Sequence, residues 1–371
     1  MHTEIIESWP GFSSLKEEWN GALTRSAGNS IFLTWEWIDA WRRSGGSRMN
    51  PVIAVARTGD GQIVGIAPFY RARLRLAGLL PLRVLRILAD YPTGAEYPDW
   101  ILVREREVEA RQALAVALAR VERWDCAWMA GTASDTGAVS RVVAACQDGG
   151  MTCRTRPRVL SAVPLPGSAS GFRAALSRNT RSTLQRQKNR LREAGTVEFM
   201  RCDREEDVPR YLDALVQLNT SRWQAEGLAG TFVRKPLEER FYRTFAPEAL
   251  RQGWLGLFAL TVNGALCAVQ VGYFYGDTFF QLQEGFAPAA PAGIGNYLRA
   301  RVIEHCIERG VHTYDFLGEF SEHKRRWLSE RRAGADIFIL RDRTSVRGRI
   351  LSLFKTWPTG RVLRPVHVLE S

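Results

Sequence analysis

The sequence predicts a mixed α/β (α+β) fold in which one unit is used twice. Two antiparallel hairpins, at residues 52–70 and 255–273, turn at the short glycine motifs Gly59-Asp60-Gly61 and Asn263-Gly264. Each hairpin is followed by a helical stretch and then by an apolar strand, in the same order in both halves. Helices that precede antiparallel strands argue against a doubly wound nucleotide fold, so each half is expected to have one central, largely antiparallel sheet flanked by helices.

The predicted elements follow the same order in each half. The first half has helices at 13–25 and 34–44, the hairpin, a helix at 104–123 and a strand at 125–131. The second half has helices at 207–224 and 235–245, the hairpin, a strand at 278–284, a helix at 293–309 and a strand at 312–318.

The segment Leu165-Pro166-Gly167-Ser168 is rich in turn-forming residues and is typical of a linker. We therefore place one domain at residues 1–165 and a second at 166–345. Beyond residue 345 the chain is basic and interrupted by Pro358, Gly360 and Pro365, so residues 346–371 are expected to form a basic, peripheral tail.

The composition excludes disordered and fibrous classes of protein. Of the 371 residues, 45% are apolar and 24% are charged, which is typical of a globular chain of two domains. Lys and Arg number 51 against 39 Asp and Glu, so the net charge of +12 favours anionic partners over cationic ones.

The cysteine and histidine patterns favour a cytoplasmic protein without a metal. The six cysteines never approach a C-x-x-C spacing, and buried reduced thiols are the expected state. The five histidines form no metal-binding pattern. No basic segment followed by an apolar one opens the chain, and Arg83 and Arg86 interrupt its most apolar early stretch, so neither a signal peptide nor a membrane span is expected.

The loop from Gly285 to Asn296 follows a predicted strand and opens a helix. With Gly293 and Gly295, such a turn exposes backbone amides at the positive end of the helix, where a phosphate or diphosphate binds. A proline-punctuated turn whose small residues allow close packing is the alternative that spacing alone leaves open.

Residues 173–192 predict a basic helix with no acidic residue before Glu193. Arg178, Arg181, Lys188 and Arg192 fall near one stripe at helical spacing. Cations that repel one another favour a nearby anion, and a solvated basic face is the alternative. Because this helix lacks the interleaved aromatic residues of RNA-binding platforms, nucleic acid is disfavoured.

A third group of polar residues stands where the strand at 312–318 ends. Asp315, Glu319 and Lys324 gather at a position where sheet scaffolds commonly carry a site. The alternative is that Asp315 hydrogen-bonds within the fold and that Lys324 belongs to a surface cluster with Arg325 and Arg326.

Together these motifs resemble the GNAT-type acyltransferase domain of bacterial polysaccharide-biosynthesis proteins of the CelD kind, which is related to the FemAB peptidyltransferases. The resemblance is carried by several motifs in their order and spacing: Arg178-Asn179-Thr180-Arg181, Ser221-Arg222-Trp223 with Gly227, Asn263-Gly264, Gly285-Phe286, Pro291-Ala292-Gly293 and Tyr314-Asp315-Phe316 with Gly318, Lys324 and Trp327. In the first half, Phe32-Leu33-Thr34-Trp35-Glu36-Trp37 and Glu96-Tyr97-Pro98-Asp99 are similar to the family's opening helix and acidic turn.

The resemblance implies two tandem GNAT-like domains and transfer of an acyl group to an amine of a small molecule or an exopolysaccharide precursor. It implies acyl-CoA as cosubstrate and no tightly bound cofactor. The phosphates of acyl-CoA are expected to bind at Arg181, Gly293, Gly295 and Asn296.

Within this framework we assign roles to the remaining polar residues. Glu284 is the candidate base, because an amine must lose a proton before it attacks the acyl group; the alternative is a carboxylate at the strand end that hydrogen-bonds to the loop. Lys324 is expected to orient an anionic substrate group or stabilise developing charge, and Asp315 to hold Lys324 or the amine. The acceptor is expected to contact three residues: Trp223, Asp99 and Glu319.

Two alternatives stay open. A FemAB-like transferase would take its acyl group from an aminoacyl-tRNA, bound by the same basic helix. A catalytically degenerate GNAT scaffold in polysaccharide assembly would explain why Ala290 stands where the GNAT signature has Gln or Arg.

Overall fold

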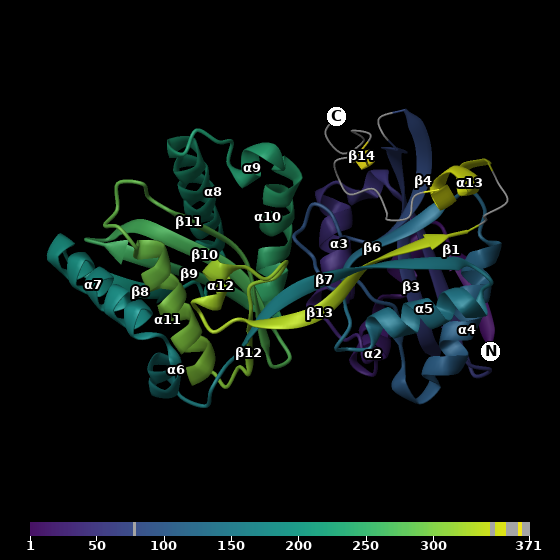
Figure 1. The fold of residues 1–371 in the computed structure, drawn as a ribbon, viewed down its shortest axis with the longest axis horizontal. Coiled ribbons are helices and arrows are strands. Elements are labelled where there is room, and N and C mark those ends of the chain that lie inside the picture. The colour runs from purple at the N-terminus through teal and green to yellow at the C-terminus, as the bar shows by residue number, and fades with distance from the viewer. Residues whose placement is uncertain (77–78, 342–345, 354–362, 366–371) are drawn as a thin grey trace. The chain divides into compact units, whose positions relative to one another are not determined.

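The computed structural model describes residues 1–76, 79–341, 346–353 and 363–365. Its contacts divide the chain into two units, Met1–Val159 with Arg332–Ser371, and Leu160–Arg331 (Figure 1). Each unit has a sheet flanked by helices, which confirms the predicted mixed α/β class.

The sheet of the first unit has the strand order β1-β2-β3-β4-β6-β13. Its strands are β1 His2–Ile6, β2 Asn50–Arg57, β3 Ile63–Leu76, β4 Leu80–Ile87, β5 Ile101–Leu102, β6 Cys126–Ala133, the first part of β7 Thr152–Pro164, most of β13 Glu330–Leu340, and β14 Leu363–Pro365. Its α-helices are α1 Trp9–Ser14, α2 Lys16–Thr24, α3 Trp35–Ser44, α4 Glu107–Arg120, α5 Ala138–Asp148 and α13 Val346–Leu353. Helix α4 packs against β1, β2 and β3, and α2 packs against β3 and β5.

The sheet of the second unit has the order β7-β12-β11-β10-β9-β8. Its further strands are β8 Val197–Arg201, β9 Leu255–Val262, β10 Ala265–Tyr275, β11 Thr278–Phe286 and β12 Thr313–Asp315. Its α-helices are α6 Ala169–Ala175, α7 Arg178–Ala194, α8 Val208–Ala225, α9 Thr231–Arg234, α10 Pro236–Arg251, α11 Ile294–Glu308 and α12 Glu322–Arg325. Helices α8 and α10 lie on one side of this sheet and α7 and α11 on the other (Figure 1).

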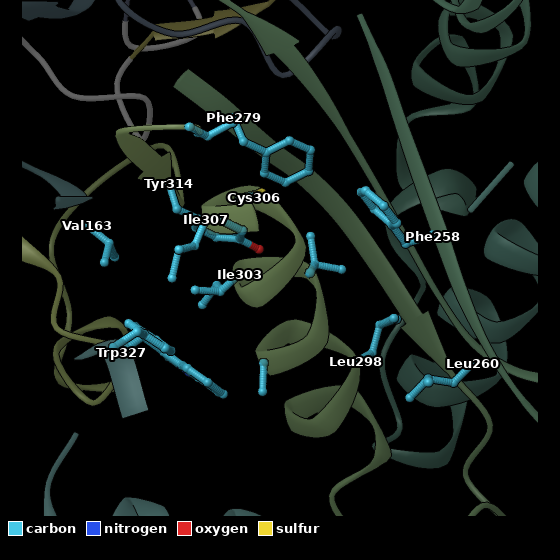
Figure 2. Close-up of a cluster of buried hydrophobic side chains, with 14 of the residues drawn as sticks. Val163, Phe258, Leu260, Phe279, Leu298, Ile303, Cys306, Ile307, Tyr314 and Trp327 are labelled. Atoms are coloured by element: carbon cyan, nitrogen blue, oxygen red, sulfur yellow. The ribbon is translucent and has the colours of Figure 1, made fainter. Parts of the chain in front are cut away.

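The core of the second unit forms between α11 and the sheet. Figure 2 shows α11 presenting Leu298 and Ile303 toward the interior, where Phe258 of β9 and Phe279 of β11 also lie. Because Tyr314 of β12 is fully buried in the same cluster, the short strand β12 is fixed by packing as well as by hydrogen bonds.

Both predicted hairpins are present. The second turns at Asn263 and Gly264, whose φ angles of 51° and 80° are those of the two-residue turn that this motif favours. The strand predicted at 312–318 is shorter than expected, because β12 ends at Asp315.

The single basic helix predicted at 173–192 is wrong, since two helices cover this segment. Helix α6 ends before Leu176, whose side chain is buried. Ser177 then caps α7, and its hydroxyl accepts a hydrogen bond from the Thr180 amide at 3.1 Å.

The unit boundaries differ from the predicted domain limits at 165 and 345. The chain returns to the first unit at Arg332, because β13 pairs with β6 from Gly334 to Leu340. The tail also departs from the expected peripheral segment, since Leu351 of α13 is buried in an apolar cluster with Leu74 and Phe338. Pro358 and Gly360 lie outside the described residues.

Candidate functional site

The second unit opens where β11 and β12 separate. These strands are parallel and share register only from Thr278–Thr313 to Phe280–Asp315. Strand β11 continues to Phe286, whereas the chain after Asp315 turns away through Leu317 and Gly318, which have φ angles of 56° and 61°. The edge of β11 beyond Phe280 is therefore left without a partner in β12.

A chain of hydrogen-bonded side chains lines this opening. Gln270 Nε2 donates to the Tyr314 hydroxyl at 2.9 Å, and that hydroxyl donates to Gln281 Oε1 at 2.6 Å. Gln281 Nε2 in turn donates to Glu284 Oε2 at 3.3 Å. Burial raises the pKa of Tyr314 well above its usual value, so the hydroxyl stays protonated and keeps its donor role.

The last residue of this hydrogen-bonded series is Glu284, the predicted base, which also forms an ion pair. Its Oε1 accepts a hydrogen bond from Arg299 Nη2 at 2.5 Å, and the side chains of Glu284 and Arg299 are 19% and 5% exposed. The backbone carbonyl of Glu284 accepts from Asn219 Nδ2 at 3.0 Å. The carboxylate is thus held in one position at the mouth of the opening, with both oxygens used as acceptors.

Arg299 also connects the first turn of α11 with α12. Its Nη1 donates to Asn296 Oδ1 at 3.2 Å and lies 3.3 Å from His323 Nε2. The other ring nitrogen of His323 lies 2.7 Å from Arg326 Nη2. Burial, together with the charges of Arg299 and Arg326, lowers the pKa of His323, so its imidazole is neutral at pH 7. Sequence reasoning missed His323 as a functional residue, and its position beside Lys324 was the only available signal.

Lys324 and Asp315 shape the backbone where β12 ends. Lys324 Nζ donates to the carbonyl of Leu317, to that of Glu319 at 2.6 Å and to Ser161 Oγ at 3.2 Å. Asp315 is fully buried, and its carboxylate accepts from the Leu317 amide at 2.7 Å. Both residues therefore hold the turn in which Glu319 is exposed.

The glycines of the loop before α11 are in close contact with neighbouring side chains. Gly293 has φ +96°, and a Cβ atom there would lie 2.2 Å from Cδ of Gln187. A Cβ atom on Gly295 would lie 2.8 Å from the Phe286 ring. Gln187 is buried, and its Oε1 has no hydrogen-bond partner among the described residues. A diphosphate that reaches Gly293 must therefore displace Gln187.

A pocket of about 240 Å³ lies beside this loop, between α6, α7 and the first turns of α11. Four cations and one carboxylate line it together with apolar side chains: Arg173, Arg181, Lys188, Arg301, Glu304, Phe172, Leu176, Leu184, Tyr297 and Ala300, along with Gln185. Arg181 Nη1 donates to the carbonyl of Ala174 at 2.7 Å, which anchors the guanidinium at the end of α6. The pocket is thus cationic at its rim and apolar at its base.

Trp223 lies on α8 of the second unit. Arg222 stacks over the Trp223 ring at 4.6 Å and over Phe286 at 4.9 Å, which places Trp223 near the end of β11. Asp99 belongs to the first unit, where it is 2% exposed and accepts a hydrogen bond from Arg141 Nη2 at 2.5 Å. Burial raises the pKa of Asp99 although Arg141 opposes the shift. The expected contact of Asp99 with substrate therefore gives way to a structural ion pair.

The structure thus brings together Glu284, Asn296, Lys324 and Asp315 around the opening, with Gly293 and Gly295 at the start of α11. Arg181 lies in the neighbouring pocket. Within the described residues, no group of three His, Cys, Asp or Glu side chains is placed to hold a metal. None of the described helices has the length and apolar character needed to cross a membrane.

Comparisons with known proteins support this architecture. The model of the acetyltransferase (GNAT) domain family matches residues 178–325, which span the opening, the loop and most of the cationic pocket. No curated protein sequence matches the chain. The matched segment is a GNAT acyltransferase domain, and the chain is an acyltransferase.

Several solved structures share the fold at low sequence identity. FemX is 12% identical with a TM-score of 0.64, and the match covers 96% of this chain and 100% of that one. The C-terminal domain of a putative lysylphosphatidylglycerol synthetase from Agrobacterium fabrum is 14% identical with a TM-score of 0.52, covering 92% and 95%. L-PGS from Bacillus licheniformis is 12% identical with a TM-score of 0.52, covering 91% and 95%.

The buried pair of Asp99 and Arg141 predicts a large loss of stability in Asp99→Asn. Removing the carboxylate leaves a buried guanidinium without its counter-charge, and we expect a loss of about 3–5 kcal/mol in the free energy of unfolding. Urea denaturation of this variant should be compared with Asp135→Asn, whose carboxylate is 45% exposed in its pair with Arg332 and should contribute about 0–1 kcal/mol. Equal losses in the two variants would contradict the structural role of Asp99.

Proposed function

We propose that this acyltransferase takes its acyl group from acyl-CoA and transfers it to an amine of a small molecule or of an exopolysaccharide precursor, as the resemblance to the CelD-like family implies. The observation that carries the proposal is the cationic pocket beside the first turns of α11, most of whose lining belongs to the matched GNAT domain. Its apolar base and four cations fit a ligand that carries both phosphates and an apolar group.

Arg181, Lys188 and Arg301 would hold phosphates of the donor. Helix α11 supports this role, because its first turn carries no acidic residue and its dipole favours an anion at that end. Gly293, Gly295 and Asn296 stay candidates for the diphosphate, with Gln187 as the side chain that must move. When Gln187 moves, its side-chain amide oxygen, which lacks a hydrogen-bond partner among the described residues, can gain one.

Glu284 is the proposed acceptor of the amine proton. An alkylammonium with a pKa of about 10.4 costs roughly 4–5 kcal/mol to deprotonate at pH 7, so a positioned base matters. The amine nitrogen bonds to the acyl carbon, the carbon–sulfur bond breaks, and the sulfur leaves as a thiolate that is then protonated. The proton lost from nitrogen goes to Glu284 or, through it, to water.

The unpaired edge of β11 offers the donors for the oxyanion. Strand amides beyond Phe280 have no partner in β12, so they can face negative charge that develops on the acyl oxygen. Lys324 and Asp315 act here as positioning residues, because they fix the turn that keeps β12 away from this edge. Trp223 and Glu319 stay candidate contacts for the acceptor.

Helix α7 favours a second candidate, an aminoacyl-tRNA as donor. Five of its arginines are exposed, and in the described part of the chain Arg178, Arg186, Arg190 and Arg192 lie within ion-pair distance of no carboxylate. Such an uncompensated cationic surface is typical of a phosphate-backbone contact.

Charge reversal separates the two donors. For acyl-CoA we expect Lys188→Glu, inside the pocket, to raise the dissociation constant at least tenfold, while Arg190→Glu, exposed on the same helix, leaves it unchanged. For tRNA both variants should weaken binding and lower its salt dependence. The readouts are ligand-induced shifts in Tm with acetyl-, succinyl- and longer acyl-CoAs, and filter binding with aminoacyl-tRNA. If neither ligand binds the wild type, the scaffold alternative replaces both.

The role of Glu284 predicts a loss of turnover in Glu284→Gln. The amide keeps the side-chain size and a contact to Arg299 but accepts no proton, so we expect kcat to fall about 10²–10⁴-fold with little change in the KM for the donor. Glu322→Gln is the matched control for removing one carboxylate from the second unit, since the Glu322 side chain is 71% exposed and pairs with Arg325 on the same helix. Retained kcat in Glu284→Gln would remove Glu284 as the base.

The lowered pKa of His323 predicts that activity falls at low pH. Its lowered pKa keeps the ring neutral above pH 6.5. As pH falls through the lowered pKa, protonation adds a positive charge between Arg299 and Arg326 and disturbs the contact that positions Glu284, so kcat should fall. His323→Gln, which cannot titrate, should shift or abolish that limb of the pH–rate profile. An unchanged acidic limb would assign it to another group.

A further inference from the structure

We infer that the first unit holds a second binding site, for a small zwitterion that carries one amine and one carboxylate, at the place where β4 and β6 separate. These strands are parallel and share register only from Val84–Cys126 to Arg86–Trp128. Strand β6 continues to Ala133, while β4 ends at Ile87. As in the pair of β11 and β12, only three residues of each strand are in register before the two strands separate.

A pocket of about 190 Å³ occupies this opening. Its lining includes Ile87, Leu88 and Asp90, which follow the last paired residue of β4, and Ala130 and Gly131 of β6. At about 30 Å³ for each water of liquid, this space suits a ligand the size of an amino acid.

The charged groups of the pocket balance one another. Arg86 and Arg158 line it together with Asp90 and Glu96, and Arg158 also pairs with Asp336 at 3.3 Å, in contrast to the four cations and one carboxylate of the pocket in the second unit. A wall with both signs of charge favours a ligand that also carries both, and it disfavours a polyphosphate.

The guanidinium of Arg86 is held in a position to bind the carboxylate of a ligand. Its Nε donates to Asp90 Oδ2 at 2.8 Å, and its guanidinium stacks over the Trp128 ring at 4.8 Å, with 15% of the side chain exposed. Neither Nη group of Arg86 has a hydrogen bond to a described residue, so both stay available as a planar pair of donors. Asp90 is fixed by a second bond, from the Tyr70 hydroxyl at 3.0 Å.

The carboxylates lie where an ammonium group would enter. Asp90 retains acceptor capacity beyond the bonds from Arg86 and Tyr70. A Cβ atom on Gly131 would lie 2.9 Å from Glu96 Oε2, which places that carboxylate against the edge of β6. Asp90 and Glu96 thus provide the negative groups of the same pocket that Arg86 lines.

The surrounding backbone supports a site at this position. Ala89 has φ +61° and Tyr97 has φ +59°, a left-handed conformation that residues with side chains rarely adopt and that is enriched at functional sites. Helix α4, the counterpart of α11 in the first unit, has Glu107 and Glu109 in its first turn, which disfavour a phosphate. The first unit therefore lacks the anion-binding features of the second.

Binding to the full-length protein tests the inference. The twenty amino acids should be screened by the shift in Tm, and the best one measured by calorimetry beside its analogue without the amine and its analogue without the carboxylate. We expect saturable binding of the amino acid and at least tenfold weaker binding of both analogues, because each lacks one of the two ionic contacts.

Two variants locate the site. Ala95→Leu fills the half-buried rim of the pocket without removing a charge, and Arg86→Lys keeps the charge but loses the planar pair of donors. Both should weaken the amino acid at least tenfold, while Glu319→Gln in the second unit should not. Ala95→Leu should also keep the wild-type Tm without ligand and the wild-type response to acyl-CoA, so failure of this site is distinguishable from failure of the donor proposal.

The inference is overturned if no amino acid binds with a dissociation constant below about 10 mM. It is also overturned if both single-charge analogues bind as well as the amino acid, or if Ala95→Leu and Arg86→Lys bind it like the wild type.

Discussion

The feature on which the second unit depends is the early separation of two parallel strands. Beyond Phe280 and Asp315 the backbone groups of the ladder lose their mutual partners, and buried amides and carbonyls must be satisfied in another way. Lys324 supplies donors to two carbonyls of the departing chain, and Asp315 accepts from the amide of Leu317. The polar residues that sequence reasoning placed at a catalytic centre thus first make the opening stable.

The side chains inside the opening form a connected hydrogen-bond network. Gln270, Tyr314 and Gln281 pass hydrogen bonds to Glu284, and Arg299 supplies the opposite charge. The network fixes the geometry of this buried ion pair more than it adds stability, and it leaves Arg299 Nε and Gln270 Oε1 without a hydrogen-bond partner among the described residues. The cationic pocket contrasts with it, because its four cations face a single carboxylate, Glu304, and so leave a net positive charge. A rigid reacting centre beside an adaptable anion site is what transfer from a large phosphorylated donor requires.

The sequence determines the hairpins, the long helices and the order of elements through local signals. Asn263-Gly264 sets its turn by conformational preference, and the apolar face of α11 predicts its burial. The break between α6 and α7 was also readable, since Ser177 is a favourable helix cap, but the continuous run of basic residues hid it. The pairing of Asp99 with Arg141 and of Glu284 with Arg299 was not readable, because no local pattern indicates which distant cation meets a buried carboxylate. Gln187 was missed for the same reason, as its contact with Gly293 is a tertiary one.

The repeated unit shows how one backbone arrangement acquires different chemistry through charge alone. Both parallel pairs end after three registered residues, so both units inherit an opening. In the second unit the next helix begins with a glycine loop and no carboxylate, whereas in the first it begins with Glu107 and Glu109. These few residues set the sign of the electrostatic potential at the start of each helix. That sign in turn favours one class of ligand for the opening over another. Since the strand geometry is common to both, the different ligands proposed for the two units would require no change in the fold, only in the side chains at the ends of the strands.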